Sequence, residues 1–358
     1  MVGDRIKLAR AKSGYSLREL AELMEETKVS PQAIGKYERG EMMPSPKVLK
    51  ELSNRLRVSL EFLIDASEVT MTEVEFRAKA ATTTKEEAQV QASVQDWVQR
   101  YLQLETILEL QSSHWEIPFE PRILSCPAEA EGLAKEVRKY WKLGAEPIAN
   151  VTELLEEKGL KVYIESLPPN VSGLTCFVTR TNHPDPVPVV VVNQTFPLER
   201  RRLTLLHELG HRLIDPKSPL TKKEEEKAAN RFAAAMLMPE EHVRREVGIQ
   251  RHSVSHAEVM AFKKLYKVSA AAFIYRLKDL QIIAENMLVY FFQSVGRTWR
   301  TAEPQPLEPR GVQYELPVRF ERLCYRALAE KLISVGAAAY LLARPADEVK
   351  AGFDGCEA

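Results

Sequence analysis

The sequence has few cysteines and no long apolar run. Its four cysteines are far apart and form no Cys-x-x-Cys pair, which argues against a disulfide framework and a structural zinc knuckle. They are Cys126, Cys176, Cys324 and Cys356. Apolar runs such as Val187–Val192 are much shorter than the ~20 residues that cross a bilayer, and no N-terminal run resembles a signal peptide. We therefore expect a cytoplasmic protein that does not contact a membrane.

An excess of charge of one sign is also absent. The 50 Lys and Arg residues balance 50 Asp and Glu residues, so nucleic acid would have to be bound by a local basic patch. Hydrophobic residues make up 45% of the 358 residues, which is enough to bury a real core in two or three domains of roughly 100–200 residues each. No internal repeat is present.

The spacing of apolar residues changes along the chain and predicts four regions: helical 1–66, a linker and connecting helix at 67–115, a mixed α+β region at 116–285, and helical 286–358. In the α+β region, short β-branched runs predict a small mixed sheet. The expected strands are 160–164, 174–178 and 187–192. The expected helices are 128–143, 148–158, 198–214, 222–236 and 257–280. The last region predicts a docking or dimerisation appendage.

One segment has the spacing of a metal site. His207 and His211 are four residues apart, so on a helix both imidazoles project from one face, where a single tetrahedral Zn²⁺ accepts both. Glu208 would lie beside the open coordination position and serve as general base. His-Glu-x-x-His also occurs by chance in many helices, so the third ligand decides whether this segment is a zinc site and of which class. Ile214 and Lys217 stand where a metzincin has Gly and His, which excludes that class.

A second predicted helix offers the third ligand. Glu226 and Asn230 are four residues apart on it, so they share a face. Glu226 would complete a His₂Glu zinc site, and Asn230 would hydrogen-bond a ligating imidazole. The alternative for Glu226 is a solvated charge run with Glu224 and Glu225. The apolar face that follows, Phe232–Met238, favours the zinc site.

Both segments together resemble the ImmA/IrrE-like family of metallopeptidases. The chain reads Thr204-Leu-Leu-His-Glu-Leu-Gly-His211 and then Glu226-Lys-Ala-Ala-Asn-Arg-Phe-Ala-Ala-Ala-Met-Leu-Met-Pro239, with Met236 where Leu is usual. The resemblance covers about 120–285. It implies a gluzincin-like fold, zinc on His207, His211 and Glu226, Glu208 as general base, and a protein substrate, typically a repressor. The oxyanion donor stays open among Tyr163, Tyr275 and His256.

The N-terminal region has the layout of a helix-turn-helix. Ser16 with Glu19 predicts a capping box for one helix, and Ser30 followed by Pro31 predicts the start of the next. On that second helix the expected inward residues are Ala33, Ile34 and Tyr37. The expected outward residues are Gln32, Gly35 and Lys36.

This region resembles the phage-repressor-like (Xre/Cro-type) helix-turn-helix family, on Ser16–Ala21, Val29–Gly40 and Met43–Ser45. The segment 22–28 is about two residues longer than the usual turn, which leaves the geometry between the helices open. The resemblance implies that the second helix enters the major groove of operator DNA, with Gln32 reading adenine and Ser30 and Lys36 near backbone or bases. Residues 1–65 hold twelve Lys and Arg against ten Asp and Glu, which indicates that binding needs a homodimer or a favourable charge distribution. Protein contact is the alternative use of this fold.

The sequence thus predicts a multidomain protein: an all-α helix-turn-helix domain, an α+β gluzincin-like metallopeptidase domain and a helical C-terminal appendage. The expected function is a DNA-binding regulator whose zinc endopeptidase cleaves a regulatory protein. One alternative is a non-proteolytic transcription factor or antitoxin whose peptidase-like domain only senses a ligand or metal. A bare metal-binding interaction module is the third, and the helix centred on Gln32 argues against it.

Overall fold

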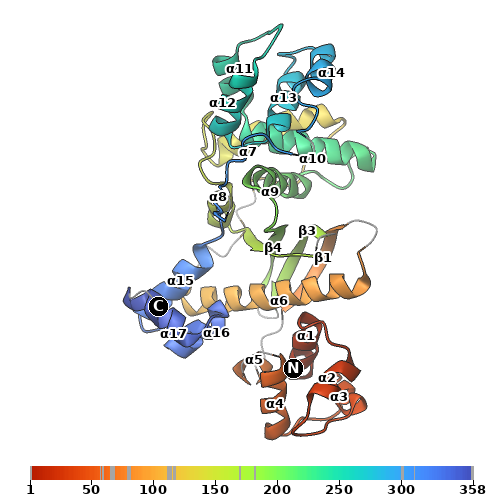
Figure 1. Ribbon diagram of the computed structural model, residues 1–358, viewed down its shortest axis with the longest axis vertical. Coiled ribbons are helices and arrows are strands. Elements are labelled where there is room, and N and C mark those ends of the chain that lie inside the picture. Colours follow the sequence, from red (N-terminus) through yellow and green to blue (C-terminus); the bar gives the residue numbers. More distant parts are fainter. Residues whose placement is uncertain are drawn as a thin grey trace.

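The computed structural model describes residues 2–56, 58, 60–64, 69–78, 82–110, 115, 118–168, 171–180, 183–299, 302–309 and 311–355. Among these, no helix has the length and apolar character needed to span a membrane. Helices of the N-terminal domain lie at one end of the elongated molecule, the sheet lies in the middle, and a second helical layer lies at the other end (Figure 1).

In the described part of the N-terminal domain, five helices surround a small apolar core that includes Ile6, Leu20, Ile34 and Leu52. The capping box predicted at Ser16 is confirmed, as is the Ser30 N-cap with Pro31 in the first turn of the next helix. The helices are α1 (Val2–Lys12), α2 (Leu17–Leu23), α3 (Pro31–Glu38), α4 (Pro46–Leu56) and α5 (Leu60–Ile64).

The four-stranded mixed sheet has the order β1-β3-β4-β2, in which only the β2–β4 pair is parallel. Its strands are β1 (Val69–Ala78), β2 (Lys161–Glu165), β3 (Val171–Arg180) and β4 (His183–Asn193). The long helix α6 (Thr84–Ile107) covers one face, where Val94, Trp97 and Val98 pack against Leu174 and Val189. Helix α9 (Leu198–Leu213) covers the other face (Figure 1). An α+β domain with a small mixed sheet is therefore confirmed.

Strand β1 lies where the sequence predicts a linker. It pairs antiparallel with β3, from Val69 opposite Arg180 to Ala78 opposite Val171. The register shifts between Thr72 and Glu75, which is a β-bulge. The bulge interrupts the alternation of apolar and polar residues in this segment. A prediction based on a period of two residues therefore does not detect the strand.

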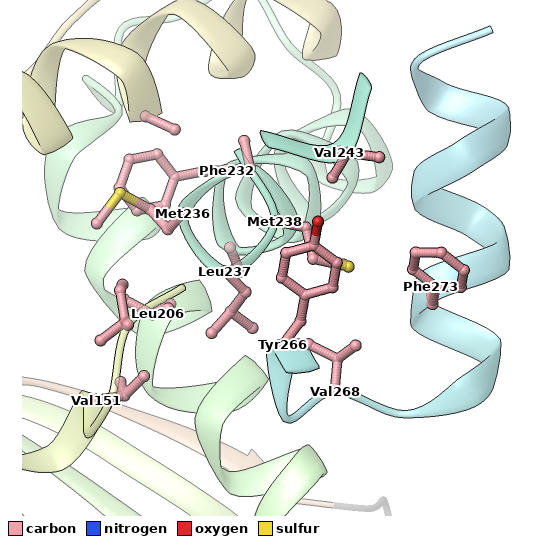
Figure 2. Packing of buried hydrophobic residues seen from close by; sticks show 14 of the residues in the cluster. Val151, Leu206, Phe232, Met236, Leu237, Met238, Val243, Tyr266, Val268 and Phe273 are labelled. Atoms are coloured by element: carbon pink, nitrogen blue, oxygen red, sulfur yellow. The ribbon is translucent and has the colours of Figure 1, made fainter. Parts of the chain in front are cut away.

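The second helical layer covers the face of the sheet that α9 contacts. The segment expected as one helix over 257–280 is two helices, because Lys267 adopts a left-handed conformation and Ser269 caps a new helix. Figure 2 shows the core of this layer, where Leu206, Leu237 and Tyr266 belong to one buried cluster. Its elements are the 3₁₀ turn η2 (Pro127–Glu129), α7 (Ala130–Tyr140), α8 (Val151–Glu157), α10 (Lys222–Leu237), α11 (Glu240–Val247), α12 (His256–Tyr266), α13 (Ala270–Asp279) and α14 (Glu285–Gln293).

The C-terminal helices pack within the same chain, on α6. Phe320, Cys324 and Ala338 join the apolar cluster between α6 and the sheet. The helices are α15 (Arg319–Ala329), α16 (Val335–Leu342) and α17 (Ala346–Asp354). The C-terminal segment that was predicted to be an appendage thus packs with α6 and the sheet, because its apolar faces are buried against α6.

Residues 302–316, apart from the undescribed 310, lie against the N-terminal half of α9 and hold it by buried ion pairs. Arg201 contacts Glu308 at 2.7 Å, and Arg202 contacts Glu315 at 2.5 Å. Glu199 of the same helix pairs with Lys263 of α12. These side chains are almost fully buried, so losing one partner would leave a buried unpaired charge. Together they fix the position of α9.

Candidate metal centre and DNA-reading helix

Helix α9 carries His207, Glu208 and His211, and its packing is set by its leucines. Leu205, Leu206, Leu209 and Leu213 are buried in the core. Gly210 brings α10 close, because a Cβ atom there would lie 3.1 Å from the Phe232 side chain and 3.3 Å from the Ala229 Cα atom. The close approach of the two helices brings their polar faces together.

Helix α10 starts at a capping box formed by Thr221 and Glu224. Its buried face is small and apolar, with Ala229, Phe232 and Ala233 against the core. Glu226 and Asn230 lie one turn apart toward α9. The sequence predicts this arrangement from their spacing.

The structure brings the three predicted ligand side chains together. The Nε2 atoms of His207 and His211 are 2.9 Å apart. The Glu226 carboxylate lies 3.5 Å from Nε2 of His207 and 3.4 Å from Nε2 of His211. One ligand atom from each residue lies within 4.8 Å of the others. Two imidazole nitrogens and a carboxylate oxygen are a donor set that suits Zn²⁺ and leaves a fourth tetrahedral position open.

Asn230 orients one of these imidazoles. Its Nδ2 donates to the backbone carbonyl of Glu226 at 2.8 Å, which fixes the amide so that Oδ1 faces Nδ1 of His207 at 3.0 Å. Because an amide oxygen can only accept, this network assigns the proton of His207 to Nδ1. The lone pair of Nε2 is then directed toward His211 and Glu226, the state that a metal ligand requires.

Glu208 is buried, with 4% of its surface exposed, on the same helix as the two histidines. One helical turn later, the Arg212 guanidinium interacts electrostatically with Glu208 and with Glu73 and Glu75 of β1, while burial lowers the pKa of Arg212. Sequence reasoning missed Arg212. Its i, i+4 spacing from Glu208 was the available signal.

The three candidates for an oxyanion donor lie in different surroundings. Tyr163 is on the α6 side of the sheet, stacked on Trp97 at 4.5 Å, with its hydroxyl donating to Glu165. Tyr275 packs beside Phe292 at 5.2 Å. His256 opens α12, with its ring 6.0 Å from that of Trp299. We assign none of these three residues a catalytic role.

Two of the three side chains predicted to contact DNA are exposed on helix α3. Gln32 and Lys36 are exposed, whereas Ile34 and Tyr37 are buried. The third, Ser30, is exposed and accepts a hydrogen bond from the backbone N–H of Ala33 as the N-cap. Gly35 was expected to face outward, and that prediction is wrong. It is buried, because the Leu17 side chain and the Arg39 guanidinium lie over it.

The long turn between α2 and α3 is held by a buried carboxylate. Glu51 of α4 accepts hydrogen bonds from the backbone N–H groups of Glu26 and Thr27 at 2.8 and 2.9 Å and from the Thr27 hydroxyl at 2.6 Å. The additional residues are therefore accommodated as an ordered loop.

Two family profiles match separate parts of the chain. Residues 155–278 match a peptidase family described as the IrrE N-terminal-like domain, and residues 6–63 match a family described as helix-turn-helix. The chain is also similar to the SPbeta prophage-derived uncharacterized HTH-type transcriptional regulator YonR of Bacillus subtilis (strain 168). The two are 42% identical over 64 residues, which is 18% of this chain and 56% of that protein. The similarity thus spans little more than half of that relative's length.

Proposed function

We propose that this chain, which carries a helix-turn-helix domain and an IrrE-like domain of a peptidase family, is a DNA-binding regulator that cleaves a regulatory protein. The reaction is zinc-dependent hydrolysis of a peptide bond, and the substrate class is a repressor. The observation that carries the proposal is the convergence of His207, His211 and Glu226 from two helices, with Asn230 fixing the tautomer of His207.

The zinc ion would be held by these two imidazoles and this carboxylate. The peptidase family that matches residues 155–278 consists generally of zinc metallopeptidases, and His207, His211 and Glu226 of this chain form a group that could hold a metal ion. When bound, zinc polarises the scissile carbonyl and lowers the pKa of a water molecule to about 7. The 47% exposure of the Glu226 side chain leaves the centre accessible to a protein segment.

Glu208 supplies the proton transfers in this proposal. Its carboxylate accepts the proton of the attacking water and then delivers it to the leaving amine, as a general base and then a general acid. Burial of Glu208 keeps bulk water from competing for that proton. The Arg212 guanidinium, one turn further along the same helix, interacts electrostatically with the Glu208 carboxylate.

The N-terminal domain would position the chain on operator DNA, in the cytoplasm. Its helix α3 would direct the exposed Gln32 toward base edges and the exposed Lys36 toward bases or phosphates, with Ser30 at the helix start. Residues 1–65 carry only two more Lys and Arg than Asp and Glu, so one copy would bind weakly at physiological salt. We propose that two copies bind an operator together.

Cleavage of regulatory proteins encoded by neighbouring genes tests this function. The wild-type chain and the Glu208→Gln variant are loaded with zinc, incubated with each purified candidate, and the products are identified by mass spectrometry. We expect one specific cleavage by the wild type and a loss of at least about 100-fold in the variant, with zinc retained. Glu225→Gln is the matched control and should cleave normally.

If Glu208→Gln cleaves like the wild type, the mechanism is wrong. If neither protein cleaves while both bind operator DNA, the chain is a sensing regulator.

A further inference from the structure

Strand β1 belongs to neither of the two matched domains. The helix-turn-helix match ends at residue 63 and the IrrE-like match begins at 155, whereas β1 spans Val69–Ala78. It pairs with β3 along the whole of that strand. Without β1, the strand β3 would be the edge of the sheet.

The β3 edge lies beside the candidate metal centre. Arg212, the residue after His211, donates from Nη2 to the backbone carbonyl of Cys176 on β3 at 2.8 Å. Its guanidinium lies 4.2 Å from the ring of Phe177, the next residue on that strand. Arg212 also interacts electrostatically with Glu208 and with two glutamates of β1. An extended segment paired with β3 would therefore pass Arg212, which itself interacts with Glu208.

The side chains of β1 indicate what kind of segment can pair with β3 in its place. Val69 is buried in the apolar cluster on the α6 side of the sheet, and Met71, Val74 and Phe76 pack against the same cluster. Thr70 and Thr72 face the other way and are exposed. The position thus accepts an extended segment with apolar side chains on one face and polar side chains on the other.

The outer edge of β1 is protected against pairing. The bulge between Thr72 and Glu75 disrupts its ladder, and Glu73 adopts a left-handed conformation with φ of 49°. Exposed charged side chains and bulges are the devices by which edge strands avoid taking on another strand. Strand β3 is therefore a more regular edge than β1 for pairing with an additional strand.

We propose that β1 occupies the place of the substrate, and that a protein substrate binds as an extended segment of alternating apolar and polar residues that replaces β1 on β3. The inference rests on the proposed peptidase function and specifies its substrate class. Addition of a strand to a sheet edge supplies backbone hydrogen bonds for affinity and side-chain positions for selectivity. Until β1 leaves, the edge of β3 is closed to such a segment.

Strand β1 is also held by the rest of the chain. Gln95 of α6 donates from Nε2 to the Val69 carbonyl at 2.7 Å. The same helix binds α1 of the N-terminal domain, where Lys12 contacts Asp96 at 2.6 Å. Gln95→Ala removes one anchor of β1 without touching β3 or α9.

A reversible cross-link tests the exchange. Thr70 and Thr179 are directly opposite each other on β1 and β3, so Thr70→Cys with Thr179→Cys can form a disulfide that locks β1 in place. Cys126, the exposed native thiol of the described residues, is replaced by Ser. The oxidised and reduced forms of one protein are then matched controls. The probe is a fluorescent peptide with the sequence of residues 69–78, added to Glu208→Gln protein and followed by anisotropy.

We expect the reduced protein to bind the peptide at least about 10-fold more tightly than the oxidised protein, and Gln95→Ala to strengthen binding to the reduced form. Equal binding to both forms, or no binding even with Gln95→Ala, would overturn the inference. With Glu208 intact, oxidation should abolish cleavage and reduction should restore it, and cleavage by the oxidised form would also overturn it. If peptide binding depends on oxidation while neither form cleaves, the exchange of β1 stands and the peptidase function fails.

Discussion

Nδ1 of His207 lies 3.0 Å from the amide oxygen of Asn230, whose Nδ2 group is fixed by the backbone carbonyl of Glu226. One asparagine thus links the histidine of α9 to the turn of α10 that carries the third candidate ligand. In this arrangement Asn230 sets the tautomer of His207, and Glu226 and Asn230 keep their relative positions.

Removing this amide should weaken zinc binding. We expect Asn230→Ala to lower the affinity by about 10–100-fold, because His207 loses the acceptor that orients it. Asn230→Asp keeps an acceptor and should lose much less. Lys227→Ala, at an exposed position of the same helix, is the control for helix stability. Competition with a chelator of known affinity measures the change, and equal affinities for Asn230→Ala and Lys227→Ala would contradict the assigned role.

Stability should fall as the pH rises because of Glu156. Burial raises the pKa of its carboxyl group to about 7 from an ordinary 4.5, although Arg319 nearby opposes the shift. A raised pKa in the folded state means that the protonated form is stabilising. That contribution is complete below pH 4.5 and is lost as the pH rises through 7.

The Glu156→Gln variant isolates this effect. We expect it to match the wild type in free energy of unfolding at pH 4.5 and to exceed it at pH 8, by at most about 3 kcal/mol. Urea denaturation of both proteins at several pH values gives the difference. A difference that does not vary with pH would show that Glu156 is not the titrating group.

The loop before α3 should depend on Glu51. Glu51→Ala leaves the backbone N–H groups of Glu26 and Thr27 without their acceptor, which we expect to cost about 2 kcal/mol locally. Hydrogen–deuterium exchange of a peptide covering residues 22–30 should then accelerate. Glu22→Ala, at an exposed position, should leave exchange unchanged. Protection retained in Glu51→Ala would mean that the loop is ordered by other contacts.

Gln32 and Lys36 should affect DNA binding in different ways. Gln32→Ala should cost about 1–3 kcal/mol on the operator and relax specificity at one base pair. Lys36→Ala should weaken binding to all sequences and reduce the salt dependence by about one counterion. Titration of operator variants at several salt concentrations separates the two effects. A uniform loss for Gln32→Ala would remove its role in base recognition.

The sequence predicts the candidate centre well because its determinants are local. Residues four apart on a helix share a face, so the positions of His207 and His211 follow from their spacing, as do those of Glu226 and Asn230. The Ser30 N-cap is equally local. Spacing alone does not predict that the two helices meet, and here the resemblance supplied the missing step.

Long-range features were not predictable in this way. The Arg201–Glu308 ion pair joins residues 107 positions apart, and neither side chain carries a local signal of the other. Strand β1 was missed because its bulge breaks the alternation between Thr72 and Glu75. Gly35 was misplaced because Leu17 of another helix covers it, which is a tertiary contact.

The zinc content of the purified chain tests the central claim most directly. The chain and the variants His207→Ala, His211→Ala and Glu226→Gln are dialysed against a zinc-buffered solution, with Glu225→Gln as control, and analysed by mass spectrometry of the metal. The account predicts about one zinc per chain in the wild type and in Glu225→Gln, and strongly reduced zinc in the other three. Zinc retained in full by those three variants, or absent from the wild type, would contradict it.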